Sequence, residues 1–318
     1  EYITVSPDGA TAWVSLQENN AIAVVDVAAA RVTAVRPLGT KDFSLAGFGF
    51  DPSDEDGATD TNTGTPAIRI GNWPVRGLYL PDAITRYTVG GENFLITANE
   101  GDARADWPGF NEEIRARAYC TAGLDPTVFG ADAARLLLDS NLGRLQLTNS
   151  PNGNDTGKNG AGQCNKLVAY GGRSFTIWRT DGAGAMTRVF DSGDDFERRT
   201  QSLPNVNFNA SNANNTLDNR STSKGPEPEA VVTATFGSKV IAFIGLERVG
   251  GVMAYDVTNP LAPTFVTYLN TREGAMGDRG PEGLEFIPAS RSPNGRPLLI
   301  VGNETSGSTA IFQINLVF

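Results

Sequence analysis

Residues 229–257 read EAVVTATFGSKVIAFIGLERVGGVMAYDV, and this stretch holds the pattern that decides the fold. It opens with an acid, runs through apolar segments that end at Glu247, and continues with a further apolar segment at 251–257. Alternating apolar residues between turn formers are typical of β-strands. The stretch therefore predicts consecutive strands that pair with one another as hairpins.

The same order of features recurs in three other segments, so it is an internal repeat. Each unit begins with an acid, a small or aromatic residue and an aliphatic residue, and continues with a turn and an apolar strand that ends in glutamate. The opening acids are Glu1, Asp82, Glu229 and Glu282, and the closing glutamates are Glu18, Glu100, Glu247 and Glu304. The two acids of a unit are 17 to 22 residues apart, which preserves the register.

Repeated strand units, together with 36 Gly and 18 Pro, predict an all-β fold, and units arranged radially would make it a β-propeller. We expect residues 1–318 to form a single propeller domain of about four to five blades, with residues 172–191 as a further strand pair. The full protein is expected to have about seven blades. Because Glu1 falls on the first strand of a blade, we expect N-terminal blades to precede it.

Two long segments interrupt the repeat, at about 101–165 and 196–224. The first holds the chain's one helical pattern, around residues 131–138, and a loop rich in Asn and Gly. The second is polar and poor in core-forming residues. Polar residues and glycines clustered between periodic segments indicate loops, so both segments are expected to be long insertions between blades.

The acids of the repeat predict a metal site. In an antiparallel hairpin the start of the first strand lies beside the end of the second, so radial units would gather their acids at one mouth of a central channel. Crowded carboxylates repel one another unless a cation neutralises them, and Ca²⁺ takes about six to eight oxygen ligands. The predicted calcium ligands are Glu18, Asp82, Glu100, Asp102, Glu227, Glu229, Glu247, Glu282 and Glu304. The alternative is that each acid caps a turn or pairs with a neighbouring Arg.

A second candidate calcium loop consists of Asp51, Asp54, Asp56, Asp60 and Asn62. These oxygen-bearing side chains follow one another at short intervals around a glycine turn, as calcium loops do. The segment lacks the glutamate that ends an EF-hand loop. The alternative is a solvated acidic loop without a metal.

The composition excludes several classes of function. A formal net charge of −10 argues against nucleic acid as a partner, because phosphate backbones require clustered Lys and Arg. The chain has no histidine, which excludes Ser-His-Asp catalysis and most zinc hydrolase sites. No apolar run reaches the roughly 18 residues of a membrane span.

The chain has two cysteines, Cys120 and Cys164, which are too few and too far apart for a metal knuckle. We expect a disulfide between them, which implies an oxidising compartment. The alternative is a pair of unpaired buried thiols.

Basic residues stand close to the acids and suggest phosphate chemistry. The candidates for binding a phosphate ester are Lys224, Arg220, Arg279 and Arg104. In that interpretation Glu229, Glu247, Glu282 and Glu304 hold calcium, and a metal-bound water attacks the ester. Ordinary charge pairing is the competing explanation.

Five runs of sequence resemble a known family. They are LQENNAIAV (16–24), TANEGDAR (97–104), GGRSFTIW (171–178), KGPEPE (224–229) and IGLER (244–248). These runs are similar to the choice-of-anchor I domain, a propeller family of bacterial surface and secreted proteins. The resemblance implies export to a secreted, periplasmic or cell-surface location, and many members are labelled alkaline phosphatase or phytase-like. The sequence departs from the family at Phe43, where the family pattern is Lys-Asp-His-Ser-Leu.

Two functions follow from these observations. The first is an extracellular calcium-binding propeller that acts as a surface or secreted binding or structural module, with an extracellular polymer as partner or with self-assembly. The second is a calcium-dependent phosphoesterase, for which a phosphate ester is the substrate. The absence of a recognisable nucleophile favours the first.

Overall fold

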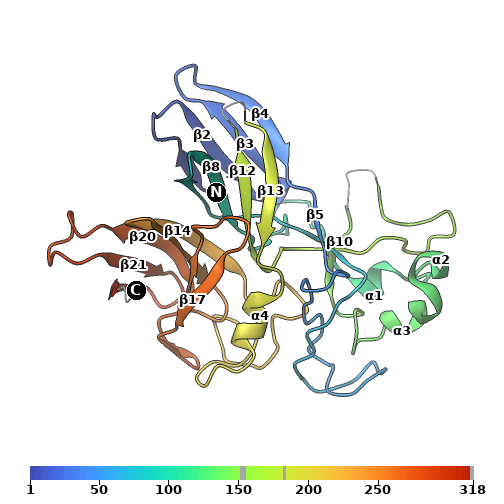
Figure 1. Ribbon diagram of the computed structural model, residues 1–318. Coiled ribbons are helices and arrows are strands. Elements are labelled where there is room, and N and C mark those ends of the chain that lie inside the picture. The colour runs from blue at the N-terminus through green and yellow to red at the C-terminus, as the bar shows by residue number, and fades with distance from the viewer. Residues whose placement is uncertain (106, 151–154, 182–183, 316–318) are drawn as a thin grey trace.

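The computed structural model describes residues 1–105, 107–150, 155–181 and 184–315 (Figure 1). Within these ranges the regular structure is mostly β, arranged in several antiparallel sheets with a few short helices. The expected all-β class is therefore confirmed. The number of blades stays a prediction.

The first sheet is built from consecutive strands of the first repeat unit. Its strands are β1 (Ile3–Val5), β2 (Thr11–Leu16), β3 (Ala21–Asp26) and β4 (Arg31–Pro37), in that order across the sheet. In the turn between β1 and β2, the Ser6 hydroxyl donates to Asp8, and Gly9 has a φ of 72°, which glycine adopts without steric cost. A short 3₁₀ turn, η1 (Gln17–Asn19), joins β2 to β3.

The third and fourth repeat units form two further sheets of consecutive strands, drawn in orange and red in Figure 1. One sheet contains β14 (Pro228–Phe236), β15 (Lys239–Leu246), β16 (Val252–Asp256) and β17 (Thr264–Leu269). The other contains β20 (Pro281–Ile287), β21 (Leu298–Asn303) and β22 (Ser308–Gln313). Between them, β18 (Arg272–Glu273) and β19 (Met276–Gly277) pair as a small hairpin. The hairpins predicted from residues 229–257 are therefore confirmed.

The second unit departs from the expected plan. Its sheet contains β7 (Ile84–Val89), β8 (Glu92–Ala98), β12 (Phe175–Thr180) and β13 (Met186–Asp191). Because β12 pairs directly with β8, with Ile177 opposite Ile96, the segment 101–165 leaves this sheet after its second strand and returns before its third. The segment therefore interrupts one sheet and does not separate two sheets, and the expected division into blades stays a prediction. Strands β8 and β12 bury apolar side chains in one core, which holds them together although the segment 101–165 separates them in the sequence.

The segment 101–165 also folds into structure of its own. It adds strands to a five-stranded sheet whose order is β5 (Thr40–Asp42), β6 (Arg76–Leu78), β11 (Val168–Ala169), β10 (Gln146–Thr148) and β9 (Glu113–Arg115). Its helical turns are α1 (Ala116–Tyr119), α2 (Pro126–Phe129), η2 (Gly130–Asp132) and α3 (Ala133–Leu136), with α1, α2 and α3 on one side of the molecule in Figure 1. The helical pattern expected at 131–138 is confirmed by α3. Within the described residues, the structure has three further helices that the sequence did not predict, α1, α2 and α4 (Asp195–Thr200). The other insertion, 196–224, does lie between two sheets.

The first strands of the four repeat units lie next to one another. β1 contacts β7, β7 contacts β14, and β14 contacts β20. Buried apolar clusters fill the spaces between successive sheets, and they include the pairs Trp13 and Leu95, Phe175 and Tyr255, and Phe243 and Leu299. This packing brings the opening ends of the units to one region of the molecule.

A disulfide joins Cys120 to Cys164, with the two Cα atoms 5.5 Å apart, so the predicted bond is confirmed. It ties the end of α1 to the residues that lead into β11. Both cysteines belong to a buried cluster with Phe43, Phe50 and Leu147. The bond therefore helps to hold the segment 101–165 against the five-stranded sheet.

We expect the Cys120→Ser/Cys164→Ser double variant to lose about 2–5 kcal/mol of unfolding free energy, because the bond restrains a long loop in the unfolded chain. Urea unfolding of the two proteins measures this difference. Mass analysis with and without reductant checks the bond itself. A double variant as stable as the wild type would contradict a structural role for the bond.

Candidate metal centre

Five buried carboxylates meet near the starts of β7 and β14. They are Asp82, Glu100, Glu227, Glu229 and Glu247, each less than a tenth exposed. Carboxylate oxygens of Asp82, Glu100 and Glu229 lie within 4.8 Å of one another. Those of Glu100, Glu227 and Glu247 form a second such group, which shares Glu100 with the first. We call these five residues the acidic centre.

Strand pairing places the acids of the second unit together. Asp82 precedes β7, and its N–H donates to the carbonyl of Ala98 at the end of β8 (3.1 Å). Glu100 follows two residues later, so the opening acid and the closing glutamate meet as the repeat predicts. The next unit is attached at the same point, because Ala83 N–H donates to the carbonyl of Glu229 (3.1 Å).

A β-bulge sets the direction of Glu229. The register between β14 and β15 shifts between Pro228 and Val231, so Glu229 lies in a local irregularity of its strand. Bulges of this kind redirect side chains and are common beside functional sites. The closing glutamate of the unit is held nearby, since Glu247 N–H donates to the carbonyl of Glu227 (2.8 Å).

Glu227 is fully buried and contacts three cations. Its carboxylate lies 2.6 Å from Arg220 Nη2, 3.1 Å from Lys224 Nζ and 2.9 Å from Arg248 Nε. Burial alone would raise the pKa of Glu227, but these cations hold it well below its ordinary value. Glu227 is therefore an ionised anchor that gathers positive charge at the centre.

Lys224 connects this anchor to the second unit. Its ammonium lies 2.7 Å from Glu100 Oε1 and 3.2 Å from Asp102 Oδ1. Although burial lowers the pKa of Lys224, the surrounding carboxylates outweigh it and raise that pKa. Lys224 is therefore charged. Asp102 itself lies at the solvent edge, with its side chain 58% exposed.

The positive charge does not balance the acids. Three cations, Arg220, Lys224 and Arg248, face the five carboxylates of the acidic centre, which leaves a net charge of −2. Within the described chain, Asp82 Oδ1, Glu229 Oε2 and Glu247 Oε2 are buried without a hydrogen-bond partner. The excess negative charge therefore lies on carboxylates that include these three.

Burial and neighbouring acids shift the titration of this region. They raise the pKa of Asp82 to about 7 and that of Glu229 to about 11, with burial as the larger cause in both. The pKa of Glu247 rises to about 9 for the same reason, even though Arg248 Nη1 lies 2.8 Å from its carboxylate. Without a further cation, these acids favour their protonated forms.

Tyr2 shows that all four opening acids share one neighbourhood. Burial, followed by the charges of Asp82, Glu282, Glu229 and Glu1, raises the pKa of its hydroxyl to about 12. The hydroxyl donates to the carbonyl of Glu282 (3.0 Å). Glu1 and Glu282 are exposed, so they form a rim around the buried acids.

The closing glutamates do not all meet as predicted. Glu100 and Glu247 belong to the acidic centre, but Glu304 is an exposed residue of a turn. Glu18 lies in the 3₁₀ turn η1, so its neighbour Gln17 takes the inward position and donates to Glu100 Oε2 (2.6 Å). Glu18 instead lines a separate surface cavity of about 880 Å³.

The four cations proposed to bind phosphate already have partners. Lys224 and Arg220 are paired with carboxylates of the acidic centre. Arg104 pairs with Glu112 (2.6 Å), and Arg279 donates to the carbonyl of Asn212 (3.1 Å). These side chains therefore neutralise or cap groups of the protein itself.

The second candidate loop is divided among several partners. Asp54 pairs with Arg144 (2.5 Å), Asp60 pairs with Arg135 (3.3 Å), and Asn62 accepts from Asp139 N–H (3.2 Å). Only the two remaining acids of the loop, Asp51 and Asp56, lie together, and they meet Asp218 from a distant segment. The structure therefore does not gather these five side chains around one point.

Sequence reasoning missed several residues of these sites. Asp218, Gln17 and Tyr2 are not among the predicted site residues. Neither is Asn212, whose side-chain amide donates to Glu247 Oε1 (2.8 Å) from the polar insertion. Tyr2 occupies the second position of the repeat unit, where a small or aromatic residue recurs, which is the signal that could have indicated it. The other three are brought in by tertiary packing.

Comparison with known proteins gives the family of this chain. A family model described as the choice-of-anchor I domain matches residues 1–260. The chain belongs to this family. The resemblance inferred from the sequence is thus confirmed.

Two curated relatives come from animals. Gigasin-3a of Magallana gigas is 31% identical over 195 residues, which cover 55% of this chain and 66% of the relative. A mesenchyme-specific cell surface glycoprotein of Strongylocentrotus purpuratus is 27% identical over 207 residues, which cover 56% of this chain and 26% of the relative. The chain thus spans less than two thirds of either relative, and the expected bacterial origin gains no support from them.

Among solved structures, hydrazine synthase of Kuenenia stuttgartiensis aligns with 98% of this chain and 58% of its own. The sequence identity is 12% and the TM-score is 0.39. No function is inferred from this alignment.

The raised pKa values predict how the metal-free choice-of-anchor chain responds to pH. A carboxyl whose pKa is raised by folding stabilises the fold while it is protonated, and this contribution disappears as pH rises through the folded-state pKa. For Asp82 and Glu247 the loss extends from about pH 4 through the folded values of about 7 and about 9. We therefore expect the melting temperature of the chelator-treated protein to fall between pH 5 and pH 9.

Differential scanning calorimetry in metal-free buffers measures this trend. The low pKa of Glu227 opposes it only below about pH 4.5, outside the window. The Glu229→Gln variant should show a smaller fall, whereas Glu285→Gln, on the exposed face of β20, should behave like the wild type. A melting temperature that rises across this window would contradict the assigned shifts.

Proposed function

We propose that this chain is an extracellular calcium-binding β-propeller module that serves in surface or secreted binding or structure. The observation that carries the proposal is the buried group of Asp82, Glu100 and Glu229, whose oxygens lie within 4.8 Å of one another. The acidic centre has two more negative than positive charges, which is the charge of one divalent cation. Burying uncompensated carboxylates is costly, and a bound cation removes that cost.

The chemistry of the donors favours calcium. The acidic centre offers carboxylate oxygens, and the chain has no histidine and no free cysteine. Oxygen donors of this kind suit hard cations, whereas zinc and copper prefer nitrogen and sulfur. Calcium takes about six to eight oxygen ligands. Rim acids such as Glu282 and nearby carbonyl oxygens would supply the ligands that the buried carboxylates do not.

Two observations support the extracellular location. The disulfide between Cys120 and Cys164 is typical of oxidising compartments. The chain belongs to the choice-of-anchor I family, and one animal relative is named a cell surface glycoprotein. In the described part of the chain, no helix has the length and apolarity needed to cross a membrane.

The arrangement of the sheets supports the propeller. The four opening strands β1, β7, β14 and β20 contact one another in sequence order, and each begins a sheet of antiparallel strands. Radial blades with their first strands innermost have this connectivity. In that architecture the acidic centre lies at the channel mouth, where a cation would join the second and third units.

We expect calcium to raise the melting temperature of the chelator-treated protein. At about 100 times its dissociation constant, one bound ion stabilises the fold by about 2.7 kcal/mol. In Glu229→Gln this rise should be largely lost, because the variant removes a negatively charged oxygen donor. Its metal-free stability at neutral pH should equal or exceed that of the wild type, because folding raises the pKa of Glu229 and the wild type therefore takes up a proton when it folds, which the Gln variant does not.

Thermal melts with chelator and with calcium make this comparison. Glu285→Gln is the matched control, since it removes the same charge from an exposed position. An unchanged melting temperature of the wild type on adding calcium would refute the proposal. So would a full calcium response in Glu229→Gln.

The geometry favours binding over phosphoester hydrolysis. The cations that would hold a phosphate ester are engaged with Glu227, Glu100 and Glu112 or with backbone carbonyls. Phosphate binding would therefore have to break ion pairs that are wholly or partly buried. We expect no calcium-dependent, chelator-sensitive hydrolysis of p-nitrophenyl phosphate or phytate. Such turnover, if lost in Glu229→Gln but kept in Glu285→Gln, would establish the hydrolase instead.

A further inference from the structure

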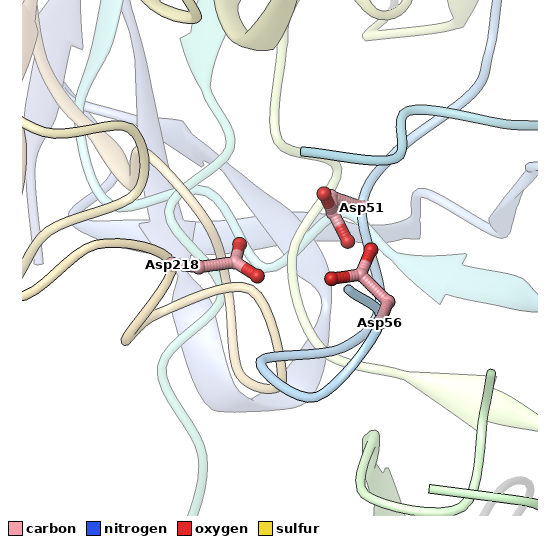
Figure 2. A group of neighbouring side chains, drawn as sticks. All are labelled: Asp51, Asp56 and Asp218. Atoms are coloured by element: carbon pink, nitrogen blue, oxygen red, sulfur yellow. The ribbon is translucent and has the colours of Figure 1, made fainter. Parts of the chain in front are cut away.

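A second group of buried carboxylates lies apart from the acidic centre. It consists of Asp51 and Asp56, from the segment between β5 and β6, and Asp218, from the polar insertion before β14 (Figure 2). These residues are 0%, 5% and 0% exposed, respectively. Ligand oxygens of the three lie within 4.8 Å of one another, and Figure 2 shows the carboxylates facing a common point. We call these three residues the aspartate cluster.

Hydrogen bonds from the protein orient each of the three carboxylates. Asp51 accepts from the N–H groups of Ser53 (3.3 Å) and Arg69 (2.5 Å). Asp56 Oδ1 accepts from Ala67 N–H (3.0 Å), and Asp218 Oδ1 accepts from the Ser221 hydroxyl. These bonds orient the aspartate cluster, but some of its carboxylate oxygens receive no hydrogen bond.

The unused oxygens point to a ligand. Among the described residues, Asp56 Oδ2 and Asp218 Oδ2 have no hydrogen-bond partner despite being buried. The side-chain oxygen of Asn209, also fully buried, has none either. Asn209 adjoins the cluster, because its side-chain amide donates to the Ser221 hydroxyl (2.8 Å), which in turn donates to Asp218. Buried oxygens without donors are rare and call for a cation or a water.

Positive charge near the cluster is insufficient. Arg69 Nε lies 3.8 Å from Asp56 Oδ2, while its Nη2 donates to the carbonyl of Ser140 and to Asn141. The neighbouring Arg173 is paired with Glu197 (2.7 Å). Three carboxylates and Arg69 leave a net charge of −2, which one divalent cation neutralises. Burial, the largest cause, raises the pKa of Asp51 to about 8 and that of Asp218 to about 9.

We propose that Asp51, Asp56 and Asp218 bind a second divalent cation, for which their oxygen-only donor set selects calcium. The ion joins the segment between β5 and β6 to the insertion before β14. This site does not rest on the proposed function, because its ligands are separate from those of the acidic centre.

The cation would also support the acidic centre from a distance. Asp218 stands two residues before Arg220 and six before Lys224, the cations that contact Glu227. Fixing Asp218 therefore fixes the start of the segment that delivers these side chains. The role of the ion is structural, and it positions residues rather than contacting a substrate.

Metal content measured by elemental analysis tests the site, after dialysis against calcium and removal of free ion. We expect two calcium ions per chain in the wild type, one in Asp218→Asn, one in Glu229→Gln and none in the double variant. Asp218→Asn keeps a side-chain oxygen that can accept the hydrogen bond from Ser221. If this variant does not fold, Asp56→Asn replaces it in the test. Asp60→Asn is the matched control from the same loop, because Asp60 is exposed, and it should keep two ions.

The outcomes separate the two sites. If Asp218→Asn and Asp56→Asn retain the wild-type calcium content, the second site is refuted, whatever Glu229→Gln does. If Glu229→Gln retains the wild-type calcium content while Asp218→Asn loses one ion, calcium binding at the acidic centre is refuted and the second site is supported. If magnesium displaces calcium at equal concentration, the choice of calcium is wrong.

Terbium luminescence tests independently where the ion binds. Trp73 lies beside the cluster, since its indole N–H donates to the carbonyl of Phe50 (3.1 Å) and its ring lies 5.2 Å from the Arg69 guanidinium. Terbium bound at Asp51 should therefore be sensitised by Trp73. We expect the signal to fall sharply in Trp73→Phe and in Asp218→Asn and to be quenched by excess calcium. A signal unchanged in both variants would overturn the proposal.

Discussion

The ion pairs of buried Glu227 are the interaction on which the rest of the acidic centre depends. Arg220, Lys224 and Arg248 approach it from the polar insertion before β14 and from the turn after β15. A buried carboxylate without such partners would be strongly destabilising. Once these cations are in place, Lys224 reaches Glu100 and draws the second unit toward the third. The packing of opening strands and the pairing of charges therefore reinforce each other.

The same interaction explains why the centre is suited to a cation. Glu227 absorbs most of the positive charge, so Asp82 and Glu229 stay buried with oxygens that lack donors in the described structure. Protonation or a bound cation can relieve this, and the two differ in their dependence on pH and calcium. The aspartate cluster repeats the arrangement with fewer cations. In both places, acids from distant segments meet, so a bound ion would tie those segments together.

The repeat predicted more of the site than any single motif. Opening acids recur at the start of the first strand of each unit, and the structure gathers Asp82 and Glu229 with the rim acids Glu1 and Glu282 around Tyr2. The prediction was weaker at the strand ends. A 3₁₀ turn puts Gln17 where the pattern placed Glu18, and Glu304 is left exposed. Small changes of turn geometry rotate a side chain to another face, and spacing in sequence does not report them.

The sequence by itself indicated the family, through five runs that resemble it. It also predicted the β-strands, the hairpin pairing within units and the disulfide, because these follow from local alternation, turn residues and cysteine number. Only the tertiary structure decided that β12 returns to pair with β8, that Asp218 meets Asp51 and Asp56, and that Arg220, Lys224 and Arg248 converge on Glu227. These contacts join segments far apart in the chain. They depend on how apolar sheet faces pack, and no local pattern encodes which distant charges that packing brings within reach.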